Sequence, residues 1–234
     1  RRSGGMLVGI DAPLDETWRI GALAGYNQGS FSVGARRSSA ATDSFHAGLY
    51  GGGDFGAAFL RSGVFYSGHA IQTDRTIAFS GFADHARADY RAGTLQAFGE
   101  IGWRWKAPLV TVEPYLNLAH VRLTTDAFAE QARDAALHAE RQTSSVTFAT
   151  TGLRGSTDFS IASRRVTASL GAGWRRALDT PAPLAILALS SADFAVAGVA
   201  IGRDAAVLDA GIPIYPTDNA TVSLAYNGQV AANA

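Results

Sequence analysis

Strict alternation of apolar and polar residues constrains the fold of this chain most strongly. From Val166 to Trp174, every second residue is aliphatic or aromatic, and the residues between them are Thr, Ser or Gly. Because successive side chains of a β-strand point to opposite faces, this stretch predicts a strand with one apolar and one small, polar face. Repeated around a closed sheet, the pattern is typical of a barrel with lipid outside and water inside.

The bulk composition agrees with such a barrel and excludes several other classes of protein. Twenty basic and twenty acidic residues cancel, so there is no electrostatic reason to expect nucleic acid as a partner. The charged fraction of 17% lies below the roughly 25% of soluble domains, and the 26 glycines of 234 residues exceed the usual ~7%. Cysteine is absent, which excludes disulfides, thiol catalysis and cysteine-ligated metals.

The same alternation recurs along almost the whole chain. We predict an all-β fold, an antiparallel up-and-down transmembrane β-barrel, in which each strand is followed by a turn or loop. The predicted strands are residues 5–12, 17–28, 43–53, 57–73, 88–105, 110–126, 143–159, 163–176, 205–214 and 220–230.

The connections between these strands alternate in length. Short connections are predicted at 13–16, 54–56, 106–109, 160–162 and 215–219, and long ones at 29–42, 74–87, 127–142 and 177–204. Outer-membrane barrels have short periplasmic turns and longer extracellular loops, whereas a soluble sandwich has no reason to keep loop length in step with strand parity. The alternation therefore favours the barrel.

Aromatic side chains on the predicted lipid face occur near both ends of the strands. Trp18 follows one short connection, and Trp103 and Trp105 precede another, while Tyr26 and Trp174 lie at the far ends of their strands. Two rings of aromatic residues at the headgroup levels are expected of a membrane barrel. We interpret these five residues as an aromatic girdle.

Charged residues fall mainly at the alternate positions of the strands, whose side chains point to the inside of the predicted barrel; we call this the inward parity. An Arg facing lipid at mid-bilayer would cost ~2–4 kcal/mol, so inward placement is strongly favoured. His120 and Arg122 share the parity of the lipid-facing residues, and we expect both to lie above the membrane. The inward charges either contact a hydrated channel and whatever passes through it, or pair with one another across the barrel. The predicted pore-lining residues are Arg19, Arg61, Glu100, Arg104, Glu113, Arg154, Arg165, Arg175 and Asp209.

Short glycine- and aromatic-containing motifs recur in a fixed order. They are GMLVGID at 5–11, WRIG at 18–21, AGY at 24–26, HAGLYGG at 46–52, QAFGEIG at 96–102, EPY at 113–115, TGLR at 151–154 and AYNGQ at 225–229. In this order and spacing, the chain resembles the C-terminal β-domain of autotransporters, the type V secretion proteins of Gram-negative bacteria.

The resemblance implies a fold and a mechanical function. The family's barrel has twelve strands, with a helix running through the pore from a secreted passenger. Residues 1–234 are then one barrel domain of about ten strands, lacking the first strand, the pore helix and the last strand. The implied function is an outer-membrane anchor and translocation conduit for an N-terminal passenger. The implied partners are outer-membrane lipid, the passenger and the barrel-assembly machinery, and the barrel is expected to be monomeric.

No chemical reaction is expected of the chain itself. Its five histidines accompany no Gly-x-Ser-x-Gly or His-Glu-x-x-His signature, and no ligand spacing suggests a metal. We therefore expect no catalytic residue, no cofactor and no metal site. The first residues have no apolar core behind them that would make a signal peptide, and we expect a piece of a longer precursor.

Two other classes of protein remain open at this point. One is an outer-membrane diffusion porin or adhesive barrel, whose extracellular loops bind a ligand. The other is a soluble β-sandwich with ligand-binding loops, since alternation also arises in a half-buried sheet.

Overall fold

The computed structural model describes residues 2–33, 38–161, 164–179, 184–189, 192–198, 202–217 and 220–231. Almost all of them lie in β-strands. No helix long and apolar enough to cross a membrane is found among these residues. The strands are β1 (Arg2–Pro13), β2 (Trp18–Val33), β3 (Ser38–Phe55), β4 (Ala58–Phe79), β5 (Phe82–Trp103), β6 (Trp105–Lys106), β7 (Thr111–Thr125), β8 (Phe128–Ala129), β9 (Leu137–Ala139), β10 (Gln142–Ile161), β11 (Arg164–Ala177), β12 (Leu184–Leu189), β13 (Ala192–Ala197), β14 (Asp204–Thr217) and β15 (Ala220–Ala231).

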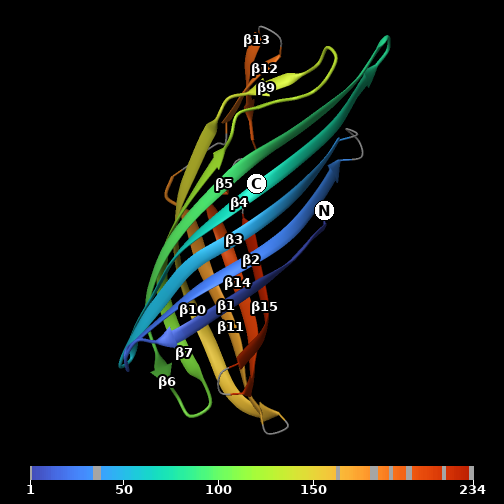
Figure 1. The fold of residues 1–234 in the computed structure, drawn as a ribbon. Coiled ribbons are helices and arrows are strands. Elements are labelled where there is room, and N and C mark those ends of the chain that lie inside the picture. Colours follow the sequence, from blue (N-terminus) through green and yellow to red (C-terminus); the bar gives the residue numbers. More distant parts are fainter. Residues whose placement is uncertain are drawn as a thin grey trace.

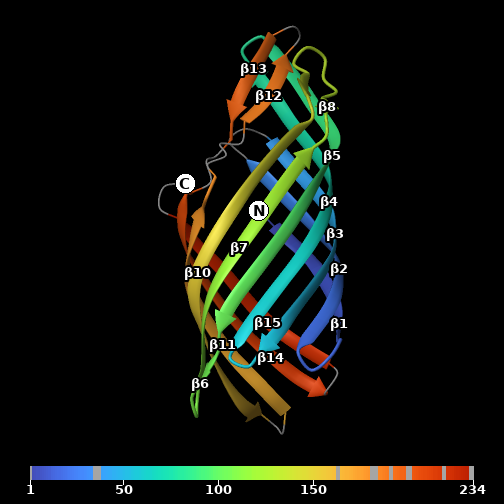
Figure 2. The same ribbon diagram turned by 90° about the vertical axis from the view of Figure 1, so that its left-hand side faces the viewer.

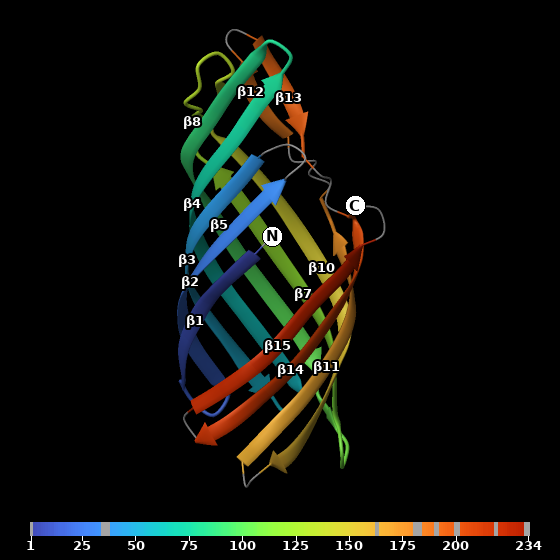
Figure 3. The same cartoon turned by 90° about the vertical axis from the view of Figure 1, so that its right-hand side faces the viewer.

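The long strands form one antiparallel sheet in chain order, β1-β2-β3-β4-β5-β7-β10-β11-β14-β15, with β6 paired to β7. The sheet is curled, and its strands run obliquely to the long axis of the molecule (Figures 1 and 2). β1 and β15 form its two edges, and no ladder joins them in the described part of the chain. Figure 3 shows these two strands on either side of the unclosed part of the sheet. This up-and-down architecture confirms the predicted fold class.

Each of the ten predicted strands corresponds to a long strand of this sheet, but two predicted long loops were wrong. Residues 29–42 mostly continue β2 and β3, and residues 74–87 mostly continue β4 and β5. Only Ser80 and Gly81 separate β4 from β5, and Gly81 adopts a φ of 84°, which glycine tolerates without steric cost. These strand ends carry polar residues on both faces, so alternation cannot reveal them.

A second, small sheet lies at the same end of the molecule as the β4–β5 turn (Figure 2). Its strand order is β13-β12-β9-β8. It is built from the other two predicted long loops, residues 127–142 and 177–204, which therefore contain more strand than the sequence indicated. The predicted short connections at 13–16, 54–56 and 106–109 lie at the opposite end. The predicted difference between the two ends therefore holds for the loops 127–142 and 177–204, but not for the two-residue β4–β5 turn.

Apolar side chains cover the outside of the curled sheet instead of filling a core. Across β2, β3, β4 and β5, Ala22 pairs with Leu49, Leu49 with Val64, and Val64 with Ala97. Leu49 is 68% exposed and Val64 is 52% exposed. No large side chain is fully buried among the described residues. A contiguous exposed apolar band of this kind marks a surface that contacts another apolar medium.

Candidate pore lining

A cluster of charges on the concave face of the sheet surrounds Glu100 of β5. Both carboxylate oxygens of Glu100 accept hydrogen bonds from Arg154 of β10, at 2.7 and 3.0 Å. Arg61 of β4 donates to the same carboxylate at 3.2 Å, and Asn117 of β7 donates at 3.4 Å. Arg154 reaches over β7 to Glu100, and the low exposure of both side chains, 25% and 6%, is consistent with a position inside the curl. Glu100 is only 6% exposed, and its charge is compensated by two arginines.

A second group of charges adjoins the first. It lies toward the end of the sheet that carries the turns at 13–16, 54–56 and 106–109, here called the short-turn end. Arg104 donates to Glu113 at 2.6 Å and to Asp54 at 3.2 Å. Arg61 links the two groups, because its guanidinium also lies 3.7 Å from the Glu113 carboxylate. Charges from β3, β4, β5, β7 and β10, together with the connection after β5, therefore form one continuous network.

Two aromatic rings pack against the guanidinium groups of this network. The guanidinium carbon of Arg61 lies 4.4 Å from the centroid of the Phe59 ring, and that of Arg154 lies 3.9 Å from the Tyr115 ring. Both rings are buried. Cation–π contacts of this kind restrict the orientation of an arginine in addition to its ion pairs.

The remaining predicted pore-lining residues lie around this network. Arg175 donates to Gln229 at 3.1 Å, and Asp209 lies 3.8 Å from Arg154. A cavity of about 370 Å³ is lined by Arg154, Arg175 and Asp209, with Glu100 at its wall. Arg19 forms an ion pair with Asp11 of β1 and lines a cavity that Asp54, Arg61 and Arg104 of the network also line. The side chain of Arg165 lies outside the described residues.

Histidines extend the polar face from the cluster toward the opposite end of the sheet, which carries the small sheet and the β4–β5 turn and is here called the long-connection end. The Nδ1 and Nε2 atoms of His46 lie 2.7 Å from Ser67 Oγ and from Asn27 Oδ1. His69 similarly contacts Ser44 at 2.8 Å and Thr94 at 3.0 Å. The imidazole rings are 6.5 Å apart and edge to face. Each ring is thus held by two neighbours from adjacent strands.

The five predicted girdle residues all have exposed side chains on the convex face. Their exposed fractions range from 38% for Trp18 to 59% for Trp105. Trp18 packs edge to face against Phe55, with ring centroids 5.4 Å apart. At the other end, Tyr26 donates to Asp43 at 2.8 Å, and the Trp174 indole donates to Asp204 at 3.1 Å. The rings thus occur at both ends of the apolar band.

The long-connection end is held together by its own polar contacts. The Asp84 carboxylate accepts hydrogen bonds from the backbone N–H groups of Arg133, Asp134 and Ala135, at 3.2, 2.8 and 2.9 Å. These bonds, led by that of Asp134, hold the pKa of the Asp84 carboxyl well below its usual range. Arg75 forms two hydrogen bonds with Glu130, at 2.8 and 2.6 Å. The segment after β8 is therefore docked on the β4–β5 hairpin.

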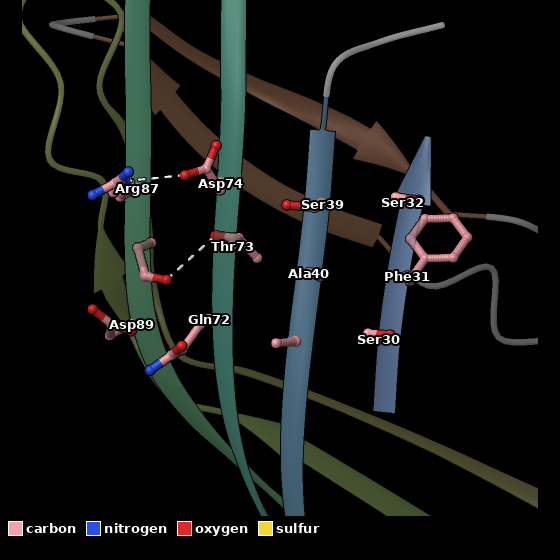
Figure 4. Close-up of a pocket in the computed structure, with 12 residues that line it drawn as sticks. Ser30, Phe31, Ser32, Ser39, Ala40, Gln72, Thr73, Asp74, Arg87 and Asp89 are labelled. Carbon is pink, nitrogen blue, oxygen red and sulfur yellow. Dashed lines mark hydrogen bonds and ion pairs between the residues drawn. The ribbon is translucent and has the colours of Figure 1, made fainter. Parts of the chain in front are cut away.

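A further depression of about 750 Å³ lies where β2 to β5 extend toward this end. Figure 4 shows its serine-rich wall, the contact between Asp74 and Arg87, and Thr73. Asp74 and Arg87 are 3.0 Å apart, and Thr73 donates to the carbonyl of Ala88 at 3.4 Å. None of the residues predicted as pore lining or girdle contributes to it.

The sequence predicted the charges of the central cluster but missed their neutral and aromatic partners. Asn117, Phe59 and Tyr115 were not singled out, although each lies on the inward parity of its strand. Inward rings such as Phe65 and Phe98, stacked at 5.9 Å, also went unnoticed because they break the expected polarity of that face. No group of three or more His, Asp or Glu side chains that could hold a metal ion occurs in the part of the chain described above.

Comparisons with known proteins agree on one family. The family model for the autotransporter β-domain matches residues 1–227. Two proteins of Serratia marcescens, both named extracellular serine protease, are 35% identical over 232 and 231 residues, which is 98% of this chain. The chain spans only 22% of the length of these relatives.

Solved structures show the same fold. The translocator domain of the autotransporter NalP from Neisseria meningitidis matches with a TM-score of 0.73 and 19% identity, over 97% of this chain and 74% of that one. The β-domain of the Bordetella autotransporter BrkA matches with a TM-score of 0.65 and 20% identity, over 99% and 86% of the two chains.

Proposed function

The chain belongs to the autotransporter β-domain family, and from this premise we propose that it anchors a passenger in the outer membrane of a Gram-negative bacterium and conducts that passenger to the cell surface. One observation carries the proposal. A single curled sheet has exposed aliphatic residues on its convex face and a network of paired charges on its concave face. A soluble sandwich would bury the aliphatic face, whereas a membrane barrel requires this arrangement.

Closure of the barrel is part of the proposal. The outer edges of β1 and β15 present unpaired main-chain groups, and such groups cannot stay unpaired in the hydrocarbon region of a bilayer. We propose that further strands join these edges, as the twelve-strand pattern of the family implies. Residues 1–234 then form most of one monomeric barrel.

The inward charges would line the conduit. Arg61, Glu100, Arg104, Glu113 and Arg154 form a network that keeps polar groups along one wall of the lumen. Water and a passing polypeptide can both exchange hydrogen bonds with such a wall. The remaining wall would be lined by Arg19, Arg175 and Asp209. We assign Arg165 to it only because this residue occupies an inward position in the alternation of its strand.

The girdle residues would set the position of the barrel in the membrane. Trp18, Trp103 and Trp105 would lie at the periplasmic headgroup level, with Tyr26 and Trp174 at the outer one. Aromatic side chains favour these levels because they combine an apolar ring with a polar atom. The other proposed partners are outer-membrane lipid and the barrel-assembly machinery.

We place no catalytic step within these residues. The Ser67–His46–Asn27 arrangement has the residue types of a hydrolytic triad, but all three residues lie in paired strands of the sheet. Their backbone N–H groups are committed to the ladders, so no oxyanion site adjoins Ser67. The protease named in the Serratia relatives belongs to those proteins, of which this chain matches a small part.

Conductance and surface display of the full-length protein test the proposal together. Glu100→Ala and Arg154→Ala should change single-channel conductance in planar bilayers, because each removes a charge from the wall and two hydrogen bonds from the network. Arg176→Gln, which changes an exposed arginine on the convex face, serves as the control. Unchanged conductance and unchanged passenger surfacing in both alanine variants would contradict a role for the network in the conduit.

A further inference from the structure

Above the apolar band, the convex face carries a depression that the conduit does not explain. It has a volume of about 940 Å³ and spans β2 to β7, and Arg141, just before β10, also lines it. Gly68 of β4 and Gly93 of β5 pair with each other at its floor. Phe45, Tyr66 and Leu95 wall it on the side of the apolar band, and three arginines, Arg91, Arg122 and Arg141, line its other side.

Two aromatic rings cover the floor of this depression, and they fit there because both central residues are glycines. A Cβ at Gly68 would lie 2.2 Å from the ring of Phe45, and one at Gly93 would lie 2.8 Å from the Tyr66 hydroxyl oxygen. The two rings therefore lean over the floor, with their centroids 6.0 Å apart. The result is an aromatic floor in the same depression as the arginines.

Two of the three arginines are not engaged in an ion pair within the described part of the chain. Arg91 and Arg122 are exposed and form no ion pair with any described residue. Arg141 lies 3.8 Å from Asp126, and Asp43, the other carboxylate of the depression, accepts hydrogen bonds from Tyr26 and Gln28. The depression therefore keeps an excess of positive charge beside an apolar surface.

The height of Arg122 matches the outer boundary of a bilayer. Val112 pairs with Trp105, a residue of the short-turn end, and Arg122 lies ten residues further along β7. At about 3.4 Å per residue and a tilt of about 40°, this separation gives roughly 26 Å along the membrane normal. That height equals the ~25 Å of a barrel's apolar band. Arg122 thus lies at the outer headgroup level, and Arg91, four residues beyond Leu95, the partner of Arg122, lies further out.

From these observations we propose that this depression binds the phosphate-bearing headgroup of an anionic lipid of the outer leaflet. The guanidinium groups of Arg91 and Arg122 bind the phosphate through charge-assisted hydrogen bonds, which arginine makes in a bidentate manner. The acyl chains of the same lipid lie on Tyr66, Leu95 and the aliphatic band below. Charge complementarity and continuity with that band favour a lipid over a soluble anion. The inference rests on the proposed outer-membrane location.

Binding of a defined glycolipid to the refolded full-length protein tests the proposal. The probes are a bisphosphorylated lipid A and the same glycolipid without phosphates, with dissociation constants measured by native mass spectrometry in detergent. We expect the phosphorylated probe to bind at least about tenfold more tightly, because only this probe can accept charge-assisted hydrogen bonds from the two guanidinium groups. The Arg91→Gln/Arg122→Gln double variant should lose this preference.

Two further variants test whether the preference for the phosphorylated probe depends specifically on Arg91 and Arg122. Arg176→Gln removes another exposed arginine of the convex face, one that lies 4.0 Å from Asp204, and should leave the preference unchanged. Arg91→Lys/Arg122→Lys keeps the charges and should retain part of the preference. Equal binding of both probes to the unaltered protein, or an equal loss in Arg176→Gln, would overturn the proposal.

The failure of this inference can be distinguished from that of the proposed function. Heat-modifiable migration and passenger surfacing are measured on the same variants. A protein that folds and displays its passenger but shows no phosphate preference contradicts only the lipid site. A protein that fails to insert into bilayers contradicts the proposed function itself.

Discussion

The Glu100 carboxylate on β5 is held by the Arg154 guanidinium on β10, and the two residues are separated by the whole of β7. Their two hydrogen bonds, at 2.7 and 3.0 Å, connect strands that no ladder connects. Glu100 is almost fully covered, while Arg154 is 25% exposed. The pair therefore acts as a tie across the concave face and fixes the local curvature of the sheet.

The strength of this tie can be measured in a double-mutant cycle. Glu100→Gln, Arg154→Gln and the double variant should show a coupling energy of about 1–3 kcal/mol in urea unfolding of the refolded protein, since the residues are in direct contact. Glu100→Gln combined with Arg176→Gln should be additive, because Arg176 lies on the other face. A coupling energy near zero for the first pair would contradict the tie.

Two leucines on neighbouring strands test which face contacts lipid. Leu49 of β3 points outward, and Leu23 of β2 has the inward parity and faces the polar wall. Leu49→Arg should lower the free energy of unfolding in bilayers by ~2–4 kcal/mol, because it places a charge in hydrocarbon. Leu23→Arg should have a much smaller effect, since water reaches that face. The opposite ranking of the two variants would show that the faces are reversed.

The docking of residues 131–136 on the β4–β5 hairpin should depend on pH through Asp84. The folded-state pKa of this carboxyl is depressed, so its contribution to docking is fully present above its unfolded pKa of ~3.9 and is lost as the pH falls through the lower folded value. The protection factors of the Asp134 and Ala135 amides, taken against their intrinsic exchange rates at each pH, should therefore be high at pH 7 and fall below about pH 4.

A matched substitution isolates the contribution of that carboxylate. Asp84→Asn should speed exchange of the same amides at pH 7 and remove the acid-dependent part of the change. Glu16→Gln, in the opposite turn, should leave their exchange unaltered. Exchange that remains slow in Asp84→Asn would mean that the backbone bonds to Asp84 do not hold this segment.

The two ends of the sheet should differ in accessibility from the cell exterior. An epitope inserted between Ser80 and Gly81 should be labelled by antibody on intact cells, because the long-connection end is proposed to be extracellular. One inserted between Ala107 and Pro108 should be labelled only after permeabilisation. Surface labelling at the second position would contradict the proposed orientation.

The sequence predicts a strand correctly wherever one face of that strand must be apolar. The stretch from Val166 to Trp174 falls within β11, and Leu170 is exposed as its parity predicted. Strand ends beyond the apolar band were missed, because Thr73 to Phe79 needs no lipid-facing side and carries no alternation. The small sheet was also missed, since β8 and β9 are too short to show any period.

The charged residues of the central cluster were predictable, but their pairing was not. Parity alone placed Glu100, Arg154 and Arg61 on one face. Which of them meet depends on strand register and on the tilt that lets Arg154 reach over β7, and neither follows from alternation. The arginines of the outer depression were overlooked for a related reason: Arg91 follows a polar strand end, and only the fold brings it beside Arg122.

Site-directed spin labelling at Leu170 and Ser169 tests the central claim most directly. The protein has no cysteine, so Leu170→Cys and Ser169→Cys each provide a single attachment point in the refolded full-length chain. Leu170 is 66% exposed on the convex face, and the Ser169 hydroxyl on the other face donates to the Gly211 carbonyl at 3.2 Å. The label at Leu170 should be relaxed by oxygen and the label at Ser169 by a water-soluble nickel chelate. Nickel accessibility at Leu170 together with oxygen accessibility at Ser169 would contradict the membrane barrel.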